Sequence, residues 1–312
     1  MKKILVTGAS GSIGLNVIKY LLSEGKYEIT ALDLKHKKAI SNLKRYKKRI
    51  NVIFGDVTDQ ILMEGLVKGH DVVIHLAGVM PPMANMSEKI NDLVDYKGCE
   101  NIIKAINFYN EKCFLMYPST TSIYGDNKSH KTNDKIKEDS LDFYGLSKLK
   151  IENLIKKKLK NYTIFRLPLV LNNVKDESFT YNIKKKDIVE VSTKEEVAYA
   201  FVKGIEYQSE LNKKVYNVGM GEEGRVEFNS ILKKLLKYHG MSCRFVFSRV
   251  FLDKNFYSPI LLDSDKLENI IHYRFDTLEK YYKRLEYKYR NRRFRKLLAK
   301  PFIIKKNKNK EG

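Results

Sequence analysis

The 312-residue chain contains only three cysteines, and Cys99, Cys113 and Cys243 lie far apart in the sequence. Such spacing excludes a disulfide-rich scaffold and a cysteine-based zinc cluster, and it is typical of a protein in a reducing cytoplasm. The six histidines are also scattered, with no HExxH pair, so we predict no metal site. A serine-hydrolase elbow and a phosphate-binding P-loop are absent from the sequence too.

Long apolar runs are missing as well. No uninterrupted apolar stretch approaches the ~20 residues that a membrane-spanning helix needs. The run near the N-terminus stops after Val6, and glycines follow at once, so it is too short for the apolar region of a signal peptide. We therefore expect a soluble, cytoplasmic protein.

Acidic residues are outnumbered, 37 against 59 lysines and arginines, which gives a formal net charge of +22. The stretch from Lys283 to Gly312 holds thirteen basic and two acidic residues, so half of this excess lies there. We call residues 286–312 the basic tail. Two interpretations stay open: peripheral contact with an anionic membrane, or a solvated end of a lysine-rich chain. Apolar residues are interleaved with the charges at Phe294, Leu297, Leu298, Phe302, Ile303 and Ile304. Nucleic-acid binding is not expected, because no recognised binding motif accompanies the charge.

Short apolar or β-branched runs alternate with longer helical patterns along most of the chain. The runs lack period-two alternation, as expected of strands that are buried on both faces. Strand–helix–strand alternation predicts an α/β fold of the Rossmann type, with a doubly wound parallel sheet. The predicted strands are 3–7, 27–33, 50–56, 70–78, 112–119, 161–168 and 214–219. Later helices are expected within 195–207, 226–240, 262–271 and 276–290, the second ending at Gly240 and the third capped by Asp263 or Ser264.

A glycine-rich turn, "TGASGSIG", follows the first predicted strand and opens a helix. Its glycines allow a tight turn and let a pyrophosphate approach the helix N-terminus, where N–H donors and positive potential meet it. Asp33 ends the second strand, where its carboxylate can bind a ribose diol and would repel a 2′-phosphate, so we predict NAD rather than NADP. The predicted cofactor-binding residues of the turn are Gly8, Ser10, Gly11, Ser12, Ile13 and Gly14.

Two further strand ends contribute candidate cofactor contacts. Asp56 and Val57 follow the third strand and are placed to flank an adenine, although Asp56 could instead cap the helix before Gln60. The fourth strand ends in small residues that would let a cofactor lie close, and its His75 is expected to be structural. The predicted contacts there are Leu76, Ala77 and Gly78.

The sequence "YGLSK" places Tyr144 and Lys148 four residues apart, so both lie on one helical face. A nearby ammonium favours the phenolate, and such a tyrosine can exchange a proton at neutral pH. Lys148 can also bond ribose hydroxyls, so both residues are predicted cofactor contacts. Chance pairs of this spacing are expected in a chain with 20 tyrosines. This pair is singled out because it opens the helix after the fifth strand, whose end carries the hydroxyls of 119–122.

Together these residues resemble the extended short-chain dehydrogenase/reductase superfamily, in particular the NAD-dependent epimerase/dehydratase family. "TGASGSIG" matches its TGxxGxxG loop, "STTSIYG" its hydroxyl-rich segment, and "YGLSK" its YxxxK motif. "FRLPLVL", "YNVGMGE" and "LLDSDKLENI" resemble weaker signatures. The resemblance implies that Thr120 is the catalytic hydroxyl, Tyr144 the acid/base and Lys148 its partner.

The resemblance also implies a domain organisation. The NAD-binding Rossmann domain would span 1–168 and be rejoined by 188–218. A small, discontinuous substrate-binding lobe would comprise 169–187 and 219–285, with the basic tail after it. A nucleotide-sugar would bind between the two lobes, and a homodimer is expected.

Three departures from the family pattern are visible. Thr121 and Ser122 stand where dehydratases of the family carry an Asp–Glu pair, which disfavours elimination of water. The segment 168–189 is shorter than in most sugar-nucleotide epimerases. Asp95 stands where an asparagine is usual.

The leading hypothesis is an NAD-dependent nucleotide-sugar epimerase that forms a transient ketosugar and returns the hydride to the opposite face. Surface-polysaccharide precursor synthesis would be its setting. A ketone reductase or dehydrogenase acting on nucleotide-sugars, using NAD or NADP, is the alternative on the same fold. A non-catalytic NAD(P)-sensing protein is the rival from another class.

Overall fold

Seven parallel strands form the main sheet, in the order β10-β7-β5-β4-β1-β2-β3. The structure is a computed structural model, and it describes the chain except for residues 82, 126–128, 173–182, 184–185, 239–257 and 290–312. The strand order confirms the predicted doubly wound parallel sheet. The strands are β1 (Lys2–Thr7), β2 (Tyr27–Asp33), β3 (Asn51–Phe54), β4 (Val72–His75), β5 (Phe114–Thr120), β7 (Tyr162–Leu167) and β10 (Lys214–Asn217).

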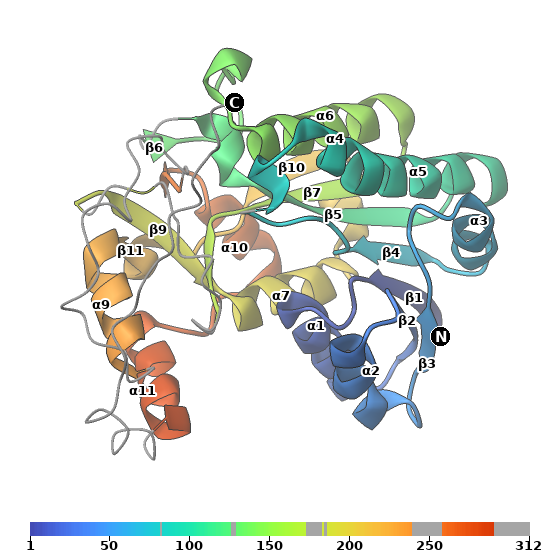
Figure 1. Cartoon of the computed structure of the whole chain (residues 1–312), viewed down its shortest axis with the longest axis horizontal. Coiled ribbons are helices and arrows are strands. Elements are labelled where there is room, and N and C mark those ends of the chain that lie inside the picture. Colours follow the sequence, from blue (N-terminus) through green and yellow to red (C-terminus); the bar gives the residue numbers. More distant parts are fainter. Residues whose placement is uncertain (82, 126–128, 173–182, 184–185, 239–257, 290–312) are drawn as a thin grey trace, which may run out of the picture.

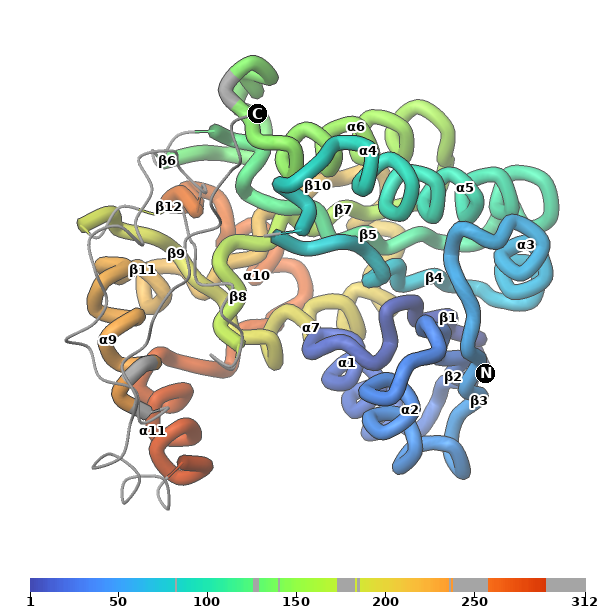
Figure 2. The backbone as a smooth tube through the Cα atoms, in the orientation of Figure 1, coloured from blue at the N-terminus to red at the C-terminus, as the bar shows by residue number. Residues whose placement is uncertain are grey.

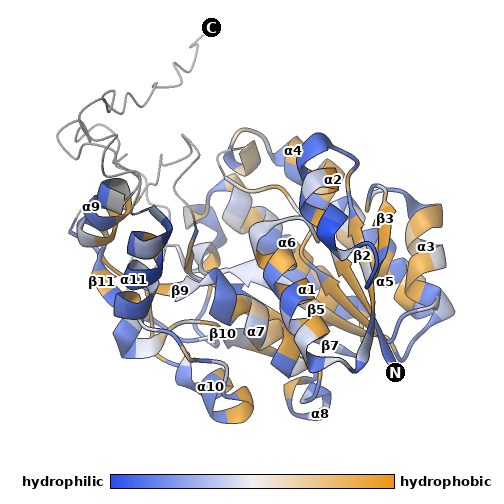
Figure 3. Cartoon of the chain, turned by 90° about the horizontal axis from the view of Figure 1, so that it is seen from below, coloured by the Kyte–Doolittle hydropathy of each residue, from blue (hydrophilic) through white to orange (hydrophobic). Residues whose placement is uncertain are grey.

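Each face of this sheet carries its own hydrophobic core, and β1 contributes to both. Ile4 and Val6 pack into the core on one face, whereas Leu5 packs into the core on the other. The strands are therefore apolar at consecutive positions, which explains the missing period-two alternation. Figure 3 shows this pattern as apolar strands between helices that are polar on their outer sides.

Helices cover the two faces as a doubly wound fold requires (Figure 1). One face is covered by α1 (Ser12–Glu24), α2 (Lys37–Leu43), α7 (Lys194–Gly204), α8 (Gln208–Leu211) and α10 (Asp265–Ile271). The other face is covered by α3 (Gln60–Lys68), α4 (Glu88–Asn91), α5 (Lys97–Tyr109) and α6 (Phe143–Lys158). Short helical turns are η1 (Lys44–Tyr46), η2 (Met83–Asn85), η3 (Asp92–Tyr96), η4 (Thr121–Tyr124), η5 (Glu138–Ser140) and η6 (Gly221–Gly224).

A smaller group of elements lies beyond the carboxyl ends of the main sheet (Figure 2). Its three-stranded sheet has the order β11-β9-β8, and a two-stranded sheet pairs β12 with β6. Aromatic and aliphatic side chains of two helices, α9 and α11, pack on β9 and form a separate core. The elements are β6 (Ser129–His130), β8 (Leu169–Leu171), β9 (Ile188–Thr193), β11 (Arg225–Glu227), α9 (Phe228–Tyr238), β12 (Ile260–Leu261) and α11 (Leu278–Tyr289).

The four later helices are present, and the cap of α10 differs in its chemistry from the prediction. Ser264 occupies the N-cap position but makes no side-chain cap hydrogen bond. Its hydroxyl instead donates to the buried carboxylate of Glu190, at 2.9 Å, which links α10 to the smaller sheet. The predicted end of α9 at Gly240 and nearly all of the basic tail lie outside the described residues.

Candidate active site

The turn between β1 and α1 is packed so tightly that two of its glycines cannot carry a side chain. Gly8 has φ +63°, and a Cβ there would lie 2.7 Å from the backbone nitrogen of Ala77. A Cβ on Gly14 would lie 2.5 Å from the carbonyl oxygen of Gly8. Gly11, at the N-cap of α1, has no side chain to accept from the first-turn N–H groups. Those donors therefore fit a pyrophosphate.

Asp33 lies beside this turn, at the end of β2. Its Oδ2 accepts a hydrogen bond from the backbone nitrogen of Ser10, at 2.7 Å, and its Oδ1 accepts one from Leu34, at 2.8 Å. Asn42 donates to the carbonyl oxygen of Ser10 at 3.1 Å, so α2 is also tied to the turn. The structure thus brings Asp33, the residue predicted to bind a ribose, next to the turn predicted to bind the pyrophosphate.

The residues after β3 take on different roles in the structure. Asp56 accepts from the backbone nitrogen of Thr58, at 2.9 Å, and is exposed. The cap of α3 is Asp59, which accepts from Leu62 at 3.1 Å, so the capping alternative for Asp56 is wrong. Val57 is buried, and its side chain leaves no room for a Cβ on the facing Gly98.

The chain after β4 passes directly against the glycine turn. The backbone nitrogen of Ala77 donates to the hydroxyl of Thr7, at 3.2 Å, and Leu76 donates to the carbonyl oxygen of Thr7. His75 is buried, and its Nδ1 lies 2.7 Å from the same Thr7 hydroxyl. Burial, aided by the charge of Lys148, lowers the pKa of His75 to about 3. His75 is therefore a neutral residue that holds β4 to β1, as expected.

Helix α6 carries both members of the Tyr–Lys pair into the interior. Asp142 caps the helix by accepting from the backbone nitrogen of Gly145, at 2.7 Å. Tyr144 and Lys148 are each 5% exposed. A Cβ on Gly145 would lie 3.3 Å from the carbonyl oxygen of Ser122, so this glycine allows α6 to approach η4 closely. The helix start therefore places the phenol beside the hydroxyl-rich end of β5.

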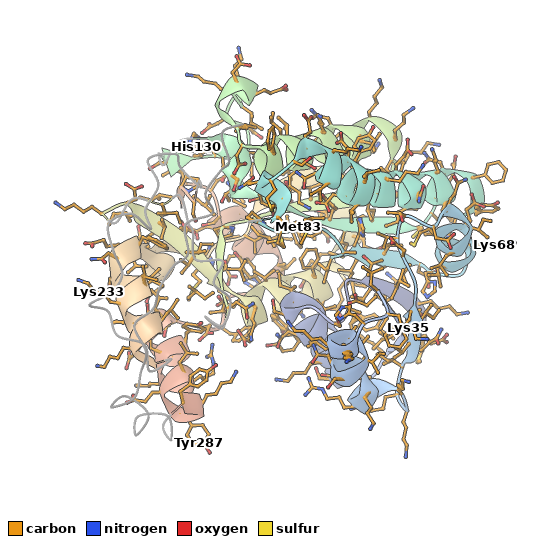
Figure 4. The ribbon with its side chains drawn as sticks, in the orientation of Figure 1. Lys35, Lys68, Met83, His130, Lys233 and Tyr287 are labelled. Atoms are coloured by element: carbon orange, nitrogen blue, oxygen red, sulfur yellow. The ribbon has the colours of Figure 1, made fainter. Side chains whose placement is uncertain are left out.

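The hydroxyl of Thr120 lies beside the phenol of Tyr144. Thr120 is buried at the end of β5, and its hydroxyl lies close enough to the phenol to lower the pKa of Tyr144. The same Oγ1 accepts from the backbone nitrogen of Ser122, at 3.2 Å, and donates to its Oγ, at 3.1 Å. On its other side the phenol donates to the Met80 thioether, at 3.7 Å. Figure 4 labels the nearby Met83, at the end of the main sheet that faces the smaller lobe.

Lys148 is held by two further buried side chains. Its Nζ donates to the Tyr117 hydroxyl at 3.1 Å and lies 3.1 Å from Oδ2 of Asp95. Burial lowers the pKa of Lys148, but Asp95 and the phenols of Tyr117 and Tyr144 outweigh burial and raise it well above its ordinary value. Lys148 is therefore an ammonium throughout the neutral pH range.

The pKa of Tyr144 reflects opposing neighbours. Burial raises this pKa, the Lys148 charge lowers it, Asp95 and Asp142 raise it, and the neighbouring Thr120 hydroxyl lowers it. The net result is a phenol that holds its proton more firmly than free tyrosine. Additional positive charge near the ring is needed before Tyr144 can act as a base at neutral pH.

Three residues at this site were not singled out as candidates from the sequence. Asp95 was noted only as a departure from the family pattern, and Tyr117 and Met80 were not identified. Each comes from a different element, and their contacts with Tyr144 or Lys148 depend on how α6 packs against β4, β5 and η3. No local spacing in the sequence signals such a contact.

Among the described residues, no group of histidine, cysteine, aspartate and glutamate side chains is arranged to hold a metal ion. The same described part of the chain has no helix long and apolar enough to cross a membrane.

The fold and this arrangement define a dinucleotide-binding protein of the short-chain dehydrogenase/reductase type, with a tyrosine–lysine pair beside the glycine turn. Residues 4–184 match the model of the NAD dependent epimerase/dehydratase family. The chain belongs to this family, and NAD is its cofactor.

Curated relatives match only part of the chain. CDP-paratose 2-epimerase of Salmonella typhi is 30% identical over 137 residues, which cover 42% of this chain and 40% of that protein. UDP-glucose 4-epimerase of Yersinia enterocolitica is 26% identical over 165 residues, 49% of this chain and 47% of that protein. The chain thus spans less than half the length of these two relatives.

Solved structures match over nearly the whole chain. UDP-glucuronic acid 4-epimerase from Bacillus cereus, in complex with NAD, has a TM-score of 0.71 at 21% identity, covering 92% of this chain and 99% of that one. The Bordetella bronchiseptica enzyme WbmH, in complex with NAD⁺, has a TM-score of 0.69 at 18% identity, covering 89% and 93%. These matches show that the fold is shared.

Proposed function

We propose that this protein is an NAD-dependent nucleotide-sugar epimerase. The observation that carries the proposal is the proximity of the buried Thr120 hydroxyl to the buried Tyr144 phenol, whose pKa it lowers, beside a glycine turn that fits a pyrophosphate. Two neighbouring hydroxyls mark the place where a substrate oxygen would lie, because each can bond it. The two curated relatives described above are named as epimerases of nucleotide-sugars, and this supports the substrate class.

The residues present fit the cofactor at its pyrophosphate and at one ribose. The uncapped start of α1 and the side-chain-free turn would hold the pyrophosphate, and Asp33 would bind a ribose diol. The remaining predicted contacts are Ser10, Ser12, Ile13, Asp56, Val57, Leu76, Ala77 and Gly78, which follow the carboxyl ends of β1, β3 and β4. When bound, NAD supplies the reversible hydride acceptor that inversion through a ketone requires.

The chain's own residues would then move one proton and hold one oxygen. Tyr144 would take the proton of the sugar hydroxyl as its carbon becomes a ketone, and would return it when the stereocentre is rebuilt. Thr120 would bond the same oxygen and fix its position. Lys148 would lower the cost of forming the phenolate and would bond the nearby ribose hydroxyls.

Elimination of water is less well supported than epimerisation. Thr121 and Ser122 are both buried, and neither provides a carboxyl group next to Thr120. A reductase or dehydrogenase would use the same three residues once per turnover, and it remains the second candidate. A sensor needs no buried phenol–ammonium pair, and the burial of Tyr144 and Lys148 therefore disfavours it.

The smaller lobe is proposed as the substrate-binding part. Its sheet and helices have a core of their own, beyond the carboxyl ends of the main strands, where open α/β sheets bind ligands. Residues 169–187 and 219–285 would form this lobe, and 1–168 with 188–218 the NAD-binding domain. Strand β9 belongs to the smaller sheet, whereas β10 belongs to the main sheet and α7 packs on it, so the chain crosses between the lobes within 188–218.

The setting and the partners are also proposals. A homodimer, a cytoplasmic location and a role in surface-polysaccharide precursor synthesis would suit a nucleotide-sugar epimerase. The basic tail would contact anionic membranes peripherally. Sedimentation with anionic liposomes, comparing the full chain with a chain that ends at Tyr289, the last residue of α11, tests this contact. Equal, negligible binding by both would rule it out.

The experiment that tests the proposed function uses a panel of UDP-, GDP-, CDP- and dTDP-sugars with the purified protein and NAD. Sugar identity is followed by NMR and NADH by absorbance in the same sample. Interconversion of stereoisomers without net NADH is the expected result. Stoichiometric NADH formation or consumption would instead identify the dehydrogenase or reductase, and no conversion of any sugar would count against both enzymes.

A further inference from the structure

A turn of π-helix interrupts the long helical segment after β4. Residues Asp92–Tyr96 form this turn, η3, between α4 and α5. A π-turn inserts one residue into a helix and redirects the side chains around it, and it is found frequently at functional sites. Here it directs Asp95 inward, where only 3% of the residue is exposed. Asp92, in the same turn, is exposed.

The Asp95 carboxylate joins two separate parts of the site. Its Oδ1 accepts from the backbone nitrogen of Val79, at 2.6 Å, and a Cβ on Gly78 would lie 3.1 Å from that same oxygen. Its Oδ2 lies 3.1 Å from Nζ of Lys148, and the two side chains are 1% and 6% exposed. One carboxylate therefore contacts both the loop after β4, beside the glycine turn, and the ammonium beneath the phenol.

The contact with Lys148 is mainly one of charge. Oδ2 accepts no hydrogen bond within the described part of the chain, although the ammonium lies within ion-pair distance. The Lys148 hydrogen bond goes instead to the Tyr117 hydroxyl. Such a charge pair is strong in a buried site, because little water screens it.

The other groups around this pair do not replace Asp95 as its counter-charge. Tyr117 on β5 and Cys99 on α5 are buried, and burial raises the pKa of each, so both are neutral. His75 on β4 is neutral for the opposite reason, since burial lowers its pKa. Asp142, at the start of α6, acts on Tyr144 and is not paired with Lys148 within the described residues.

We propose that Asp95 is a positioning residue for the acid/base pair, one that holds the Lys148 ammonium against the loop after β4 and offsets its charge. In the free protein, Tyr144 then stays a protonated phenol. Its proton becomes labile when positive charge arrives beside it. The significance for catalysis rests on the proposed function, whereas the coupling between the three side chains does not.

The variant Asp95→Asn separates the two contacts of this carboxylate. An asparagine oxygen can still accept from Val79, so the loop keeps its hydrogen bond while the charge is lost. Asp92→Asn is the matched control, because it removes the same charge from the same turn at an exposed position. Thermal unfolding of both variants checks that they are folded.

The measurement is NMR of protein labelled with ¹³Cζ-tyrosine, without NAD, with Tyr144→Phe used to assign the signal. At one alkaline pH at which all proteins are folded, the ratio of tyrosinate to tyrosine at Tyr144 should rise about tenfold in Asp95→Asn. Asp92→Asn should change this ratio less than twofold, because solvent screens its charge. An unchanged or lower ratio in Asp95→Asn would overturn the proposal.

A second readout ties the coupling to turnover once a substrate is known. In Asp95→Asn the side of the profile on which kcat/KM rises with increasing pH should move about one pH unit toward lower pH. Since the NMR titration needs no substrate, the two proposals fail separately. A shifted titration without turnover of any sugar contradicts the epimerase alone, and turnover without a shifted titration contradicts the role of Asp95 alone.

Discussion

The carboxylate of Glu152 and the guanidinium of Arg166 form a two-point ion pair inside the protein. Nε of Arg166 donates to Oε1 at 2.9 Å, and Nη2 donates to Oε2 at 2.8 Å. Glu152 lies on α6, two turns after Tyr144 and one turn after Lys148, whereas Arg166 lies on β7. Nη1 of Arg166 also donates to the Tyr124 hydroxyl at 3.0 Å, and so to η4. This pair therefore fixes the helix of the acid/base residues against the sheet and against the turn after Thr120.

Breaking this pair from one side should be costly. Arg166→Met leaves the Glu152 carboxylate buried without its main partner, and we expect a loss of about 3–5 kcal/mol in the free energy of unfolding. Urea denaturation measures this loss. The double variant Glu152→Met/Arg166→Met should lose less than Arg166→Met alone, because no unpaired charge is left.

The exposed pair of Lys160 and Glu111 provides the control. Their side chains are 74% and 63% exposed, so Lys160→Met should change the unfolding free energy by no more than about 1 kcal/mol. If Arg166→Met were as mild as Lys160→Met, the buried pair would not hold α6 in place.

The buried His75 should make the free energy of unfolding depend on pH. Its folded-state pKa of about 3 lies below the ordinary value of 6.5, so the unfolded chain binds the extra proton between these values. Stability from this residue is therefore complete above pH ~6.5 and is lost as pH falls toward 3, at up to ~1.4 kcal/mol per pH unit. His75→Asn, which can still bond Thr7, should flatten the dependence of the unfolding free energy on pH between 6.5 and 5.

His272 tests whether the effect is specific to a buried histidine. It is exposed at the end of α10 with φ 49°, a conformation that asparagine tolerates. His272→Asn should leave the pH dependence as in the wild type. An equal flattening in both variants would mean that burial of His75 is not the cause.

Much of the fold could be predicted because its signals are local. A run such as 70–78 is apolar at consecutive positions, which indicates a strand buried on both faces, and β4 lies within it. The glycine turn and the spacing of Tyr144 and Lys148 are likewise local. Each depends on the backbone geometry of a few consecutive residues, and the residue types and their spacing in the sequence indicate that geometry.

The unpredicted features depend on contacts between distant segments. The pairing of Lys148 with Asp95 needs the π-turn, which no simple periodicity announces, and it needs α6 to lie across β4 and β5. Similarly, Ser264 occupies the predicted cap position, but its hydroxyl donates a hydrogen bond to Glu190 on β9. Tertiary packing decides between such competing partners, and local propensity does not.

The glycine turn makes a prediction about cofactor affinity. Gly14→Ala would place a methyl group 2.5 Å from the carbonyl oxygen of Gly8, so the turn must open. We expect at least a tenfold loss of NAD affinity by isothermal titration calorimetry, because the N–H donors of α1 move with the turn. Unchanged affinity would show that the pyrophosphate does not lie there.

A second glycine separates this effect from a general loss of stability. Gly25 ends α1 with φ +68°, and a Cβ there would meet nothing within 4 Å. Gly25→Ala should cost about 1 kcal/mol of stability from backbone strain and leave NAD affinity unchanged.

Asp33 should set the preference for NAD over NADP. Its carboxylate would repel a 2′-phosphate, and Asp33→Asn removes the charge while an amide oxygen can still accept from Ser10. The ratio of the two dissociation constants, measured by calorimetry, should move toward NADP by about tenfold. Asp59→Asn, at the cap of α3, should leave that ratio unchanged.

Tyr144→Phe tests the chemistry most directly. The phenol is buried and its hydroxyl donates to the Met80 thioether, so removing one oxygen should leave the fold and NAD affinity nearly intact. Turnover of the substrate found in the sugar panel should fall at least a hundredfold, because general acid–base catalysis contributes about 10²–10⁴-fold to a rate. The matched control is Tyr109→Phe, an exposed tyrosine on α5 whose hydroxyl bonds Glu64, and it should turn over like the wild type. Wild-type turnover in Tyr144→Phe would transfer the acid/base role to another group.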